Sequence, residues 1–312
     1  MLDFSNSKIL IVGDVMLDKY YFGKVDRISP EAPVPIVNIQ KEESRLGGAS
    51  NVANNIVSLG GHSLLCGVIG HDLFGKEIER ISRHKNIDTF LLKTSSPTIT
   101  KARIIGGKQQ IVRGDYEDKS ELNADNKKLF RDTISRILPE YDILVISDYG
   151  KGLISEDLCR YLIKLAHKYD KKVIIDPKGK NWEKYSGADI VTPNVKELSD
   201  IVGYTVPNTD RAIEKAAREA ITNNHLTALL VTRSDKGMSL IGPIPPIHIP
   251  THSEEVFDVS GAGDTVVATL GLCLAAGFEI SEAMRTANIA AGIVVKKIGT
   301  ATLTIEELVQ QK

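Results

Sequence analysis

Residues 8–14 form the run Lys8-Ile9-Leu10-Ile11-Val12-Gly13-Asp14, an apolar stretch that ends in a glycine and an aspartate. A continuous apolar run of this length is typical of a strand that is buried on both faces of a parallel sheet. Similar runs recur at residues 64–69, 143–147, 173–176, 190–192 and 229–232. Stretches with helical periodicity occur at residues 50–59, 75–84, 129–138, 156–167, 212–222, 262–276, 282–298 and 305–311. This alternation predicts an α/β fold with a doubly wound, mostly parallel sheet flanked by helices.

Two segments break the alternation and predict a second, smaller β-layer. Residues 20–40 combine aromatic residues and prolines with an alternating run at 34–39. Residues 98–113 alternate polar and apolar side chains on both sides of Gly106-Gly107, which is typical of a hairpin. We expect one domain over residues 1–312, with insertions at about 18–40 and 97–115 that fold over the sheet edge as a lid. The alternative is a pair of peripheral hairpins without a role.

Composition limits the class of protein. The chain has 42% hydrophobic and 25% charged residues, which is ordinary for a soluble globular protein. A net charge of -1 and 5% aromatic residues offer neither the basic field nor the stacking surface of a nucleic-acid-binding protein. The three cysteines have no metal or disulfide spacing, and no apolar stretch reaches the roughly 20 residues that span a bilayer. With no signal pattern at the N-terminus, we expect a cytoplasmic protein without nucleic-acid or membrane partners.

Polar residues follow several of the predicted strands, at the edge where open α/β sheets bind ligands. They are Asp14, Asp148, Asp176 and Asn194, with Asp18 four residues beyond Asp14. One aspartate after a strand is more often a turn former, but four polar residues at successive strand ends indicate a polar site. A glycine cluster, Gly47-Gly48-Ala49-Ser50-Asn51, begins the first helix. It is either a tight turn with a helix cap or part of the same site.

The most specific local pattern is Asp258-Val259-Ser260-Gly261-Ala262-Gly263-Asp264-Thr265, which leads directly into an apolar helix. Small residues let the backbone approach a ligand, and the free N–H groups at a helix start attract an anion. Asp264 in the first turn would ordinarily only stabilise the helix end. Beside a phosphate-sized hole it can instead take the proton from a hydroxyl that attacks a phosphoryl group. The Walker A, dinucleotide, zinc-hydrolase and α/β-hydrolase motifs are all missing from the sequence.

Two widely separated motifs resemble the signatures of the ribokinase-like (PfkB-type) sugar kinases. Gly47-Gly48-Ala49-x-Asn51-x-Ala53 resembles the first signature, and Asp258-x-x-Gly261-Ala262-Gly263-Asp264-Thr265 resembles the second. The resemblance covers essentially the whole chain. It implies the ribokinase-like fold with a small β-sheet lid, with ATP and Mg²⁺ as cofactors.

Further segments resemble the heptose-phosphate kinases of the ADP-heptose pathway, namely residues 13–18, 27–35, 109–115, 147–152 and 176–178. This resemblance implies ATP-dependent phosphorylation of the anomeric hydroxyl of D-glycero-β-D-manno-heptose 7-phosphate to the 1,7-bisphosphate, a step toward the lipopolysaccharide core. The His-x-Gly-His motif of the adenylyltransferase found fused to such kinases is not in this sequence, so we expect the stand-alone kinase. The alternatives are a kinase for another sugar or sugar phosphate, and a non-catalytic sugar-binding regulator.

The resemblance assigns roles to individual positions. Asp264 would be the catalytic base, with an anion hole formed by Gly261, Ala262 and Gly263. The nucleotide and Mg²⁺ would be bound by Asn194, Val195, Lys196, Glu197, Thr232, Ser234, Gly237, Asn288 and Gly292, with Glu197 acting on the metal indirectly. The sugar would be held by Asp14, Asp18, Gly47, Gly48, Asn51 and Asp148. Asp258 is the candidate for a monovalent cation such as K⁺, and the lid is the candidate interface of a homodimer.

The phosphate of the acceptor needs fixed cations, which a protein of net charge -1 must supply locally. Lys101 and Arg103 fall on one face of their predicted strand, Arg113 lies on the same hairpin, and Lys178 follows the strand that ends at Asp176. We expect these four cations to bind the substrate. The alternative is that they are solvated surface charges, the usual fate of a lysine or arginine.

Overall fold

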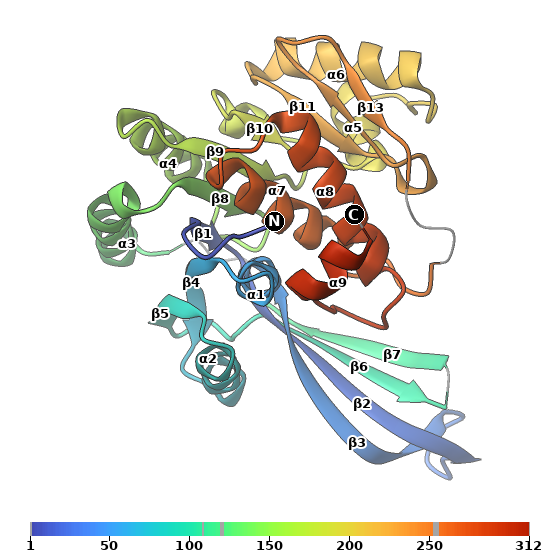
Figure 1. The fold of residues 1–312 in the computed structure, drawn as a ribbon. Helices are drawn as coiled ribbons and strands as arrows, with labels where there is room; N and C mark the ends of the chain where they lie inside the picture. Colours follow the sequence, from blue (N-terminus) through green and yellow to red (C-terminus); the bar gives the residue numbers. More distant parts are fainter. Residues whose placement is uncertain (1, 108, 119–121, 252–255, 312) are drawn as a thin grey trace.

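The computed structural model describes residues 2–107, 109–118, 122–251 and 256–311. Its main sheet has nine strands in the order β13-β12-β11-β10-β9-β8-β1-β4-β5 (Figure 1). The strands are β1 (Lys8–Gly13), β4 (His62–Gly70), β5 (Asp88–Thr94), β8 (Ile143–Ser147), β9 (Lys172–Asp176), β10 (Ile190–Val191), β11 (Leu229–Thr232), β12 (Met238–Ile241) and β13 (Ile247–Ile249). All pairings from β5 to β11 are parallel, and β12 and β13 pair antiparallel at one edge. The predicted doubly wound, mostly parallel sheet is confirmed.

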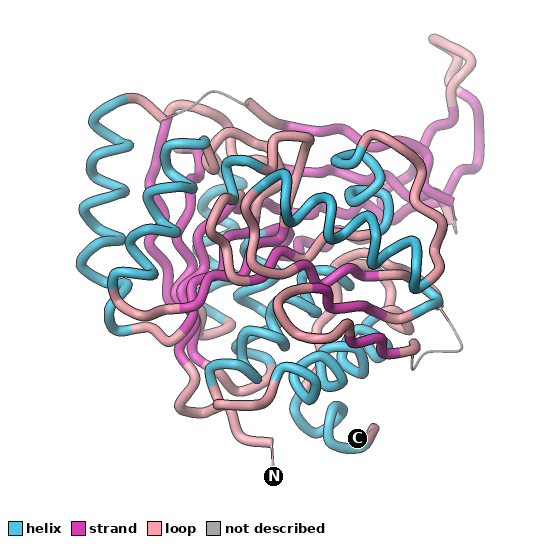
Figure 2. Tube along the Cα trace, turned by 90° about the horizontal axis from the view of Figure 1, so that it is seen from above, coloured by secondary structure: helices cyan, strands magenta, loops and turns pink. Residues whose placement is uncertain are grey.

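Helices cover both faces of this sheet (Figures 1 and 2). Ile9 and Ile11 of β1 belong to one core cluster, while Leu10 and Val12, which point to the opposite face, belong to the other. The first face is covered by α1 (Ala49–Ser58), α2 (Leu73–His84), α7 (Ala262–Ala275), α8 (Ile280–Val294) and α9 (Ile305–Gln310). The second face is covered by α3 (Ala124–Ile137), α4 (Glu156–Lys168), α5 (Val195–Val202) and α6 (Asp210–Asn224). Because both faces are covered, the middle residues of the central strands β1, β8 and β9 are apolar at successive positions.

Some elements differ from the prediction for identifiable reasons. The sequence pattern did not predict β5 and β13, which are partly exposed strands at the two sheet edges, or β12, a strand of only four residues next to β13. α3 begins five residues before the predicted residue 129, because its first turns face solvent and carry no apolar periodicity. α8 ends at Val294 rather than at residue 298, since the carbonyl of Val295 accepts the N–H groups of Phe257 and Asp258 instead of continuing the helix.

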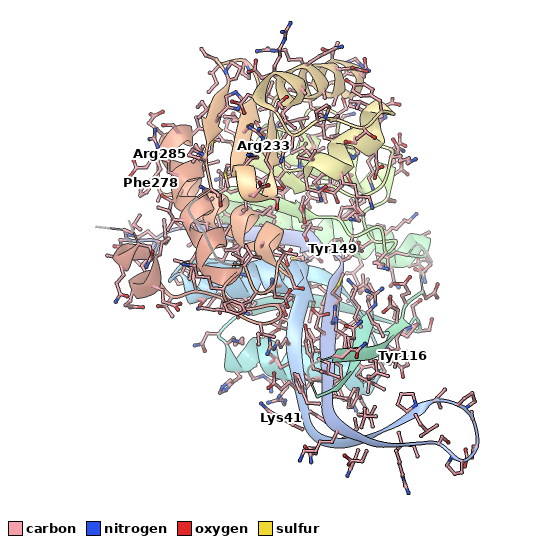
Figure 3. All side chains as sticks on the ribbon, turned by 90° about the vertical axis from the view of Figure 1, so that its right-hand side faces the viewer. Lys41, Tyr116, Tyr149, Arg233, Phe278 and Arg285 are labelled. Carbon is pink, nitrogen blue, oxygen red and sulfur yellow. The ribbon has the colours of Figure 1, made fainter. Side chains whose placement is uncertain are left out.

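The two predicted insertions form one four-stranded sheet, in the order β3-β2-β6-β7. Its strands are β2 (Val15–Ile28), β3 (Pro35–Gly48), β6 (Thr100–Gly106) and β7 (Gln109–Tyr116). The first insertion is therefore longer than the predicted 18–40, since β3 continues into Gly48 at the start of α1. Residue 108 of the second insertion lies outside the described residues. This sheet, hereafter the lid, projects from the body, with the β2–β3 hairpin extending farthest (Figures 1 and 3).

The topology marks where a ligand would bind. The chain passes from β1 to β4 and β5 on one side, and later occupies β8 and β9 on the other side of β1. The order in which the chain adds strands therefore reverses between β1 and β8, although these two strands are parallel. The crevice outside such a point is the usual ligand site of open α/β sheets. Asp14 follows β1 at this crevice, and Asp148 and Tyr149 follow β8. Within the described part of the chain, no helix is long and apolar enough to span a membrane.

Candidate active site

Asp264 lies in the first turn of α7, where contacts from two other elements hold its carboxylate. Its Oδ2 accepts a hydrogen bond from Asn51 Nδ2 of α1 at 2.8 Å, and its Oδ1 accepts one from the Tyr149 hydroxyl at 2.7 Å. Only 3% of the residue is exposed. The two glycine-rich motifs, far apart in sequence, thus meet through Asn51 and Asp264.

Burial raises the pKa of Asp264 to about 6. The hydrogen bonds from Asn51 and Tyr149 act in the opposite direction, because they stabilise the ionised carboxylate. A carboxylate with this pKa is ionised at neutral pH and is more basic than an exposed aspartate. Both properties suit a general base.

The start of α7 offers donors to an anion. Its N-cap, Gly261, has a φ of 80° and no side-chain cap, and a Cβ there would lie 2.7 Å from Asn51 Nδ2. Within the described residues the N–H groups of Gly263 and Asp264 have no acceptor, and a Cβ on Gly263 would meet nothing within 4 Å. Open space in front of free N–H groups at a positive helix end fits a phosphoryl group.

Asp14 supplies a free acceptor on the opposite side of the crevice. Its Oδ2 accepts the N–H groups of Tyr149 at 2.8 Å and Lys151 at 3.1 Å. Its Oδ1 is buried and has no partner among the described residues. Burial, followed by the nearby Asp148 carboxylate, raises the pKa of Asp14 to about 6. A buried acceptor without a donor is costly unless a ligand hydroxyl satisfies it.

The inner face of the lid places predicted residues beside these carboxylates. Arg103 donates to Asp18 Oδ1 at 2.6 Å, and Lys101 lies over the Tyr149 ring, 5.6 Å from its centre. The structure therefore brings Lys101 and Arg103 to one face, as strand alternation predicted. Gly47 and Gly48 are required here, because a Cβ on them would lie 2.7 Å from Asp18 Oδ2 and 2.6 Å from the Asp14 carbonyl oxygen, respectively.

Both carboxylate oxygens of Asp148 are occupied by contacts within the protein. Its Oδ1 accepts the Gly150 N–H at 2.8 Å, while its Oδ2 accepts the Tyr185 hydroxyl at 2.7 Å and pairs with Lys184. It is 2% exposed. The structure thus gives Asp148 a bracing role in the loop after β8 and does not support the direct sugar contact expected from sequence.

The predicted nucleotide residues gather on the other half of the same sheet edge. Asn194 and Glu197 form a capping box at the start of α5, whose first turn also holds Val195 and Lys196. Asn194 pairs with Thr232, and Ser234 and Gly237 form the turn that follows. On α8, which also carries Gly292, Asn288 donates to the Pro250 carbonyl at 2.7 Å. The capping box is a structural use of Asn194 and Glu197 that leaves their side chains at the sheet edge.

Three of the four predicted phosphate-binding cations already pair with carboxylates, since Arg103 binds Asp18 as described above. Arg113 forms two hydrogen bonds with Asp115, at 2.8 and 2.9 Å, on the same strand. Lys178 pairs with Glu197 at 2.8 Å, on the nucleotide side of the site. Arg113 lies opposite Arg103 across the β6–β7 pair and therefore shares a face of the lid with Arg103 and Lys101, whereas Lys178 is not part of this group.

Sequence reasoning missed the roles of Tyr149 and Asp176. Tyr149 lies between the body and the lid (Figure 3) and contacts both Asp14 and Asp264. Asp176 is the last residue of β9; burial, followed by the carboxylates of Asp264 and Glu197, raises its pKa well above the usual value. Both residues lie at the carboxyl ends of strands, which was the available signal, but only the folded chain shows which side chain reaches Asp264.

The candidate cation residue Asp258 braces two loops. Its carboxylate accepts the N–H groups of Ser260 at 2.9 Å and Gly299 at 2.8 Å. No group of three or more His, Cys, Asp or Glu side chains that could hold a metal ion occurs in residues 2–107, 109–118, 122–251 and 256–311.

The protein combines a doubly wound sheet and a β-lid with the buried Asp264 carboxylate beside an anion hole and the unpaired Oδ1 of Asp14. Together these features define a phosphotransferase that acts on a hydroxyl compound. The sequence profile of the pfkB family of carbohydrate kinases matches residues 6–307, and the chain belongs to this family.

Curated relatives are bifunctional proteins. The chain is 46% identical over 308 residues to the bifunctional protein HldE of Haemophilus influenzae, covering 98% of this chain and 63% of that protein. It is 45% identical over 310 residues to the bifunctional protein HldE of Vibrio vulnificus, covering 99% of this chain and 64% of the relative. The chain thus spans a little under two thirds of the length of these relatives.

Solved structures confirm the ribokinase-like fold. Phosphofructokinase-2 of Escherichia coli, in complex with potassium, matches with a TM-score of 0.79 and 20% identity, over 97% of each chain. Ribokinase of Arabidopsis thaliana, complexed with ribose and ATP, matches with a TM-score of 0.76 and 19% identity, over 98% of each chain.

Proposed function

We propose that this chain transfers the γ-phosphoryl group of ATP to the anomeric hydroxyl of D-glycero-β-D-manno-heptose 7-phosphate, giving the 1,7-bisphosphate. This proposal rests mainly on one observation: the carboxylate of the buried Asp264 is held by Asn51 and lies at the helix start where the N–H groups of Gly263 and Asp264 are free. The segments that resemble heptose-phosphate kinases support this acceptor, as does the identity to HldE along nearly the whole chain.

The proposed chemistry is in-line displacement at phosphorus. Asp264 takes the proton of the anomeric hydroxyl as its oxygen forms a bond to the γ-phosphorus. The bond from that phosphorus to the β–γ bridging oxygen breaks, and ADP leaves with the electron pair. The N–H groups at the start of α7 stabilise the charge on the transferred group.

The acceptor would lie between Asp264 and Asp14. The free Oδ1 of Asp14 would accept a sugar hydroxyl, and Asp18 and Asn51 would orient the ring from the base of the lid. Lys101 and Arg103 would place positive charge over the acceptor when the lid closes. Arg113 and Lys178 could join only by leaving Asp115 and Glu197, respectively.

The nucleotide would occupy the half of the edge marked by Asn194, Thr232 and Gly237. Asp176 and Glu197 fit Mg²⁺ there, because Asp176 carries an excess of neighbouring negative charge, and Mg²⁺ usually takes one or two carboxylates together with substrate phosphates. When bound, Mg²⁺ supplies charge stabilisation to the β- and γ-phosphates. Glu197 would act on it indirectly, since its oxygens already bind Asn194 and Lys178.

We also propose a monovalent cation near Asp258 and a homodimer through the lid. Asp258 holds the 258–260 turn against Gly299, where backbone carbonyls could bind K⁺ while the carboxylate braces the loops. Equal kcat in potassium and choline chloride at the same ionic strength would reject the cation.

An acceptor panel tests the function. Purified protein with ATP and Mg²⁺ is given heptose 7-phosphate, fructose 6-phosphate, tagatose 6-phosphate, ribose and adenosine, and ADP release is measured. We expect the highest kcat/KM with heptose 7-phosphate, and a product identified by mass spectrometry as the 1,7-bisphosphate. A higher value with another acceptor would reassign the substrate, and sugar binding without ADP release would favour the non-catalytic regulator.

A further inference from the structure

The turn between β11 and β12 has a strained backbone. Ser234 has a φ of 54°, in the left-handed region that residues other than glycine rarely adopt. Gly237 also has a positive φ, and a Cβ there would collide with the carbonyl oxygen of Ile249 on β13. The N–H of Arg233 closes the turn by donating to the Gly237 carbonyl at 2.7 Å. A strained turn of this kind persists only where the surrounding structure fixes it.

Arg233 provides that support as a buried cation. Only 3% of the residue is exposed, and it lies in the body, away from the lid (Figure 3). Its guanidinium donates to Asp210 Oδ1 at 2.6 Å and to Ser239 Oγ at 2.8 Å, which joins the start of α6 to β12. Asn208 Oδ1 accepts from Arg233 Nε at 2.9 Å, and Asn208 Nδ2 donates to the Arg233 carbonyl at 2.9 Å. Asn208 therefore holds both the side chain and the backbone of Arg233. These four residues are hereafter the Arg233 cluster.

A further set of polar groups extends the Arg233 cluster to β13. Ser239 Oγ lies 2.7 Å from His248 Nδ1 on β13, and His248 Nε2 lies 3.2 Å from Glu214 Oε1 on α6. Because an arginine can only donate, Ser239 accepts from Arg233 and can donate its own hydrogen to His248. The network thus satisfies a buried charge that would be very costly without partners, and it connects the turn to α6, β12 and β13.

We propose that Arg233 and Asn208 are positioning residues for the nucleotide, which hold residues 233–237 in the conformation that binds ATP before ATP arrives. The inference rests on the proposed function, which places the nucleotide at this turn. Thr232, just before the turn, pairs with Asn194 at the same sheet edge. Neither positioning residue needs to touch ATP, because both act through the backbone of the turn. A turn that is already ordered loses little conformational freedom on binding, which strengthens the binding.

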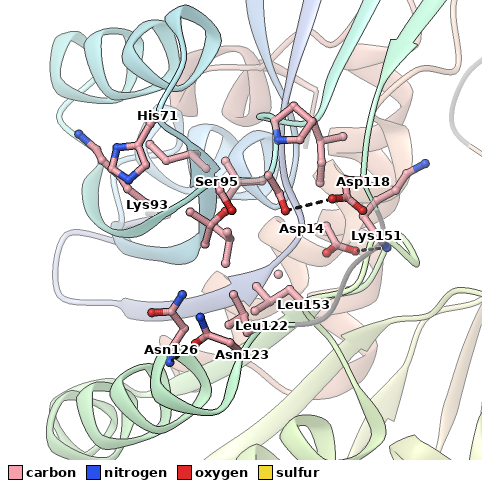
Figure 4. A pocket seen from close by; sticks show the side chains of 18 residues that line it. Asp14, His71, Lys93, Ser95, Asp118, Leu122, Asn123, Asn126, Lys151 and Leu153 are labelled. Atoms are coloured by element: carbon pink, nitrogen blue, oxygen red, sulfur yellow. Dashed lines mark hydrogen bonds between the residues drawn. The ribbon is translucent and has the colours of Figure 1, made fainter.

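The proposed acceptor half of the crevice lies apart from the Arg233 cluster. A cavity of about 470 Å³ opens beside Asp14 (Figure 4). The described residues that line it all lie between Gly13 and Leu153 in the sequence, whereas the Arg233 cluster lies within residues 208–239. A change in the cluster should therefore weaken nucleotide binding and leave acceptor binding nearly unchanged.

Arg233→Gln tests the proposal by removing the buried charge. We expect KM for ATP, and Kd for ADP in calorimetric titrations, to rise about tenfold or more, as the loss of a charge-assisted contact implies. KM for heptose 7-phosphate should stay nearly unchanged. Arg233→Lys, which keeps the charge, should recover part of the nucleotide affinity. Arg218→Gln, at an exposed arginine of α6, is the matched control and should bind ADP as the wild type does.

Asn208→Ala provides a second test that keeps the arginine in place. It removes both contacts of Asn208 with Arg233 and should raise Kd for ADP at least about threefold, since ordinary hydrogen bonds are lost. If the folded variants bind ADP as the wild type does, or if the affinities for ADP and heptose 7-phosphate fall together, these residues only stabilise the fold and the inference is wrong. A wild type that binds ADP but does not phosphorylate heptose 7-phosphate would reject the proposed function, and ADP titrations would still decide the role of Arg233.

Discussion

Asp264 is the residue on which the proposed chemistry depends. Replacing it with Asn keeps the shape of the side chain but removes the proton acceptor. We expect kcat to fall by about 10²–10⁴, the usual contribution of a general base, with ATP affinity retained in calorimetric titrations. Asp132→Asn, on the exposed surface of α3, is the matched control and should keep normal turnover. Near-normal kcat in Asp264→Asn would remove Asp264 from the mechanism.

The raised pKa of Asp264 predicts opposite effects of pH on activity and stability. The base is ionised only above about pH 6, so kcat should fall as pH drops through that value. Because the folded protein keeps this proton to a higher pH than the unfolded chain, stability should instead fall as pH rises from 3.8, the ordinary pKa of an aspartate, to about 6. Thermal melts should therefore show Asp264→Asn gaining stability relative to wild type across that window. An unchanged difference would contradict the buried, shifted carboxylate.

Tyr149→Phe removes the hydroxyl of Tyr149 and keeps its aromatic ring, so it tests the role of the hydroxyl alone. That hydroxyl donates to Asp264 and lowers its pKa, so its loss should move the acid limb of the kcat profile to higher pH. At alkaline pH, where Asp264 is ionised in both proteins, kcat should be similar. Tyr161→Phe, whose hydroxyl bonds weakly to the Arg131 carbonyl away from the site, is the control. An acid limb at the same pH in all three proteins would leave Tyr149 without a positioning role.

The lid is attached to the body at its base and projects from it at its tip. Asp18–Arg103 and Lys101–Tyr149 are contacts at the base, while the far β2–β3 hairpin extends beyond the body (Figure 3). If the lid closes over the sugar to exclude water, heptose 7-phosphate should slow amide exchange across Thr98–Arg113 and Val34–Ile39. The effect should be largest near Lys101. Mass spectrometry that finds no slowing in either segment would favour hairpins without a role.

At the scale of the whole molecule, the lid of a single chain exposes apolar side chains to water. Ile28 is 62% and Val34 51% exposed at the outer end of the β2–β3 hairpin. Because exposed apolar side chains on open strands favour pairing, we expect a dimer that Ile28→Asp with Val34→Asp converts to monomer in sedimentation experiments. Leu73→Asp, at a leucine that is 78% exposed on α2, should leave the dimer intact. A monomeric wild type would reject this interface.

The apolar runs determined most of the main sheet, and the glycine motifs indicated where the proposed reaction centre lies. These features are local: a strand buried on both faces must be apolar throughout, and an anion hole at a helix start needs small residues next to it in sequence. The edge strands β5 and β13 were not predicted, because their exposure depends on their position at the sheet edge, which sequence periodicity does not record.

Only the tertiary structure decided which side chains meet. In the folded chain, Asn51 and Tyr149 bind the carboxylate of Asp264. Asp148 binds Tyr185 and Lys184. Arg113 and Lys178 each pair with a carboxylate. Such pairings depend on distances between segments that lie far apart in the chain, whereas the sequence pattern reports only on neighbours along it. For the same physical reason, the cavity beside Asp14 exists only in the folded molecule.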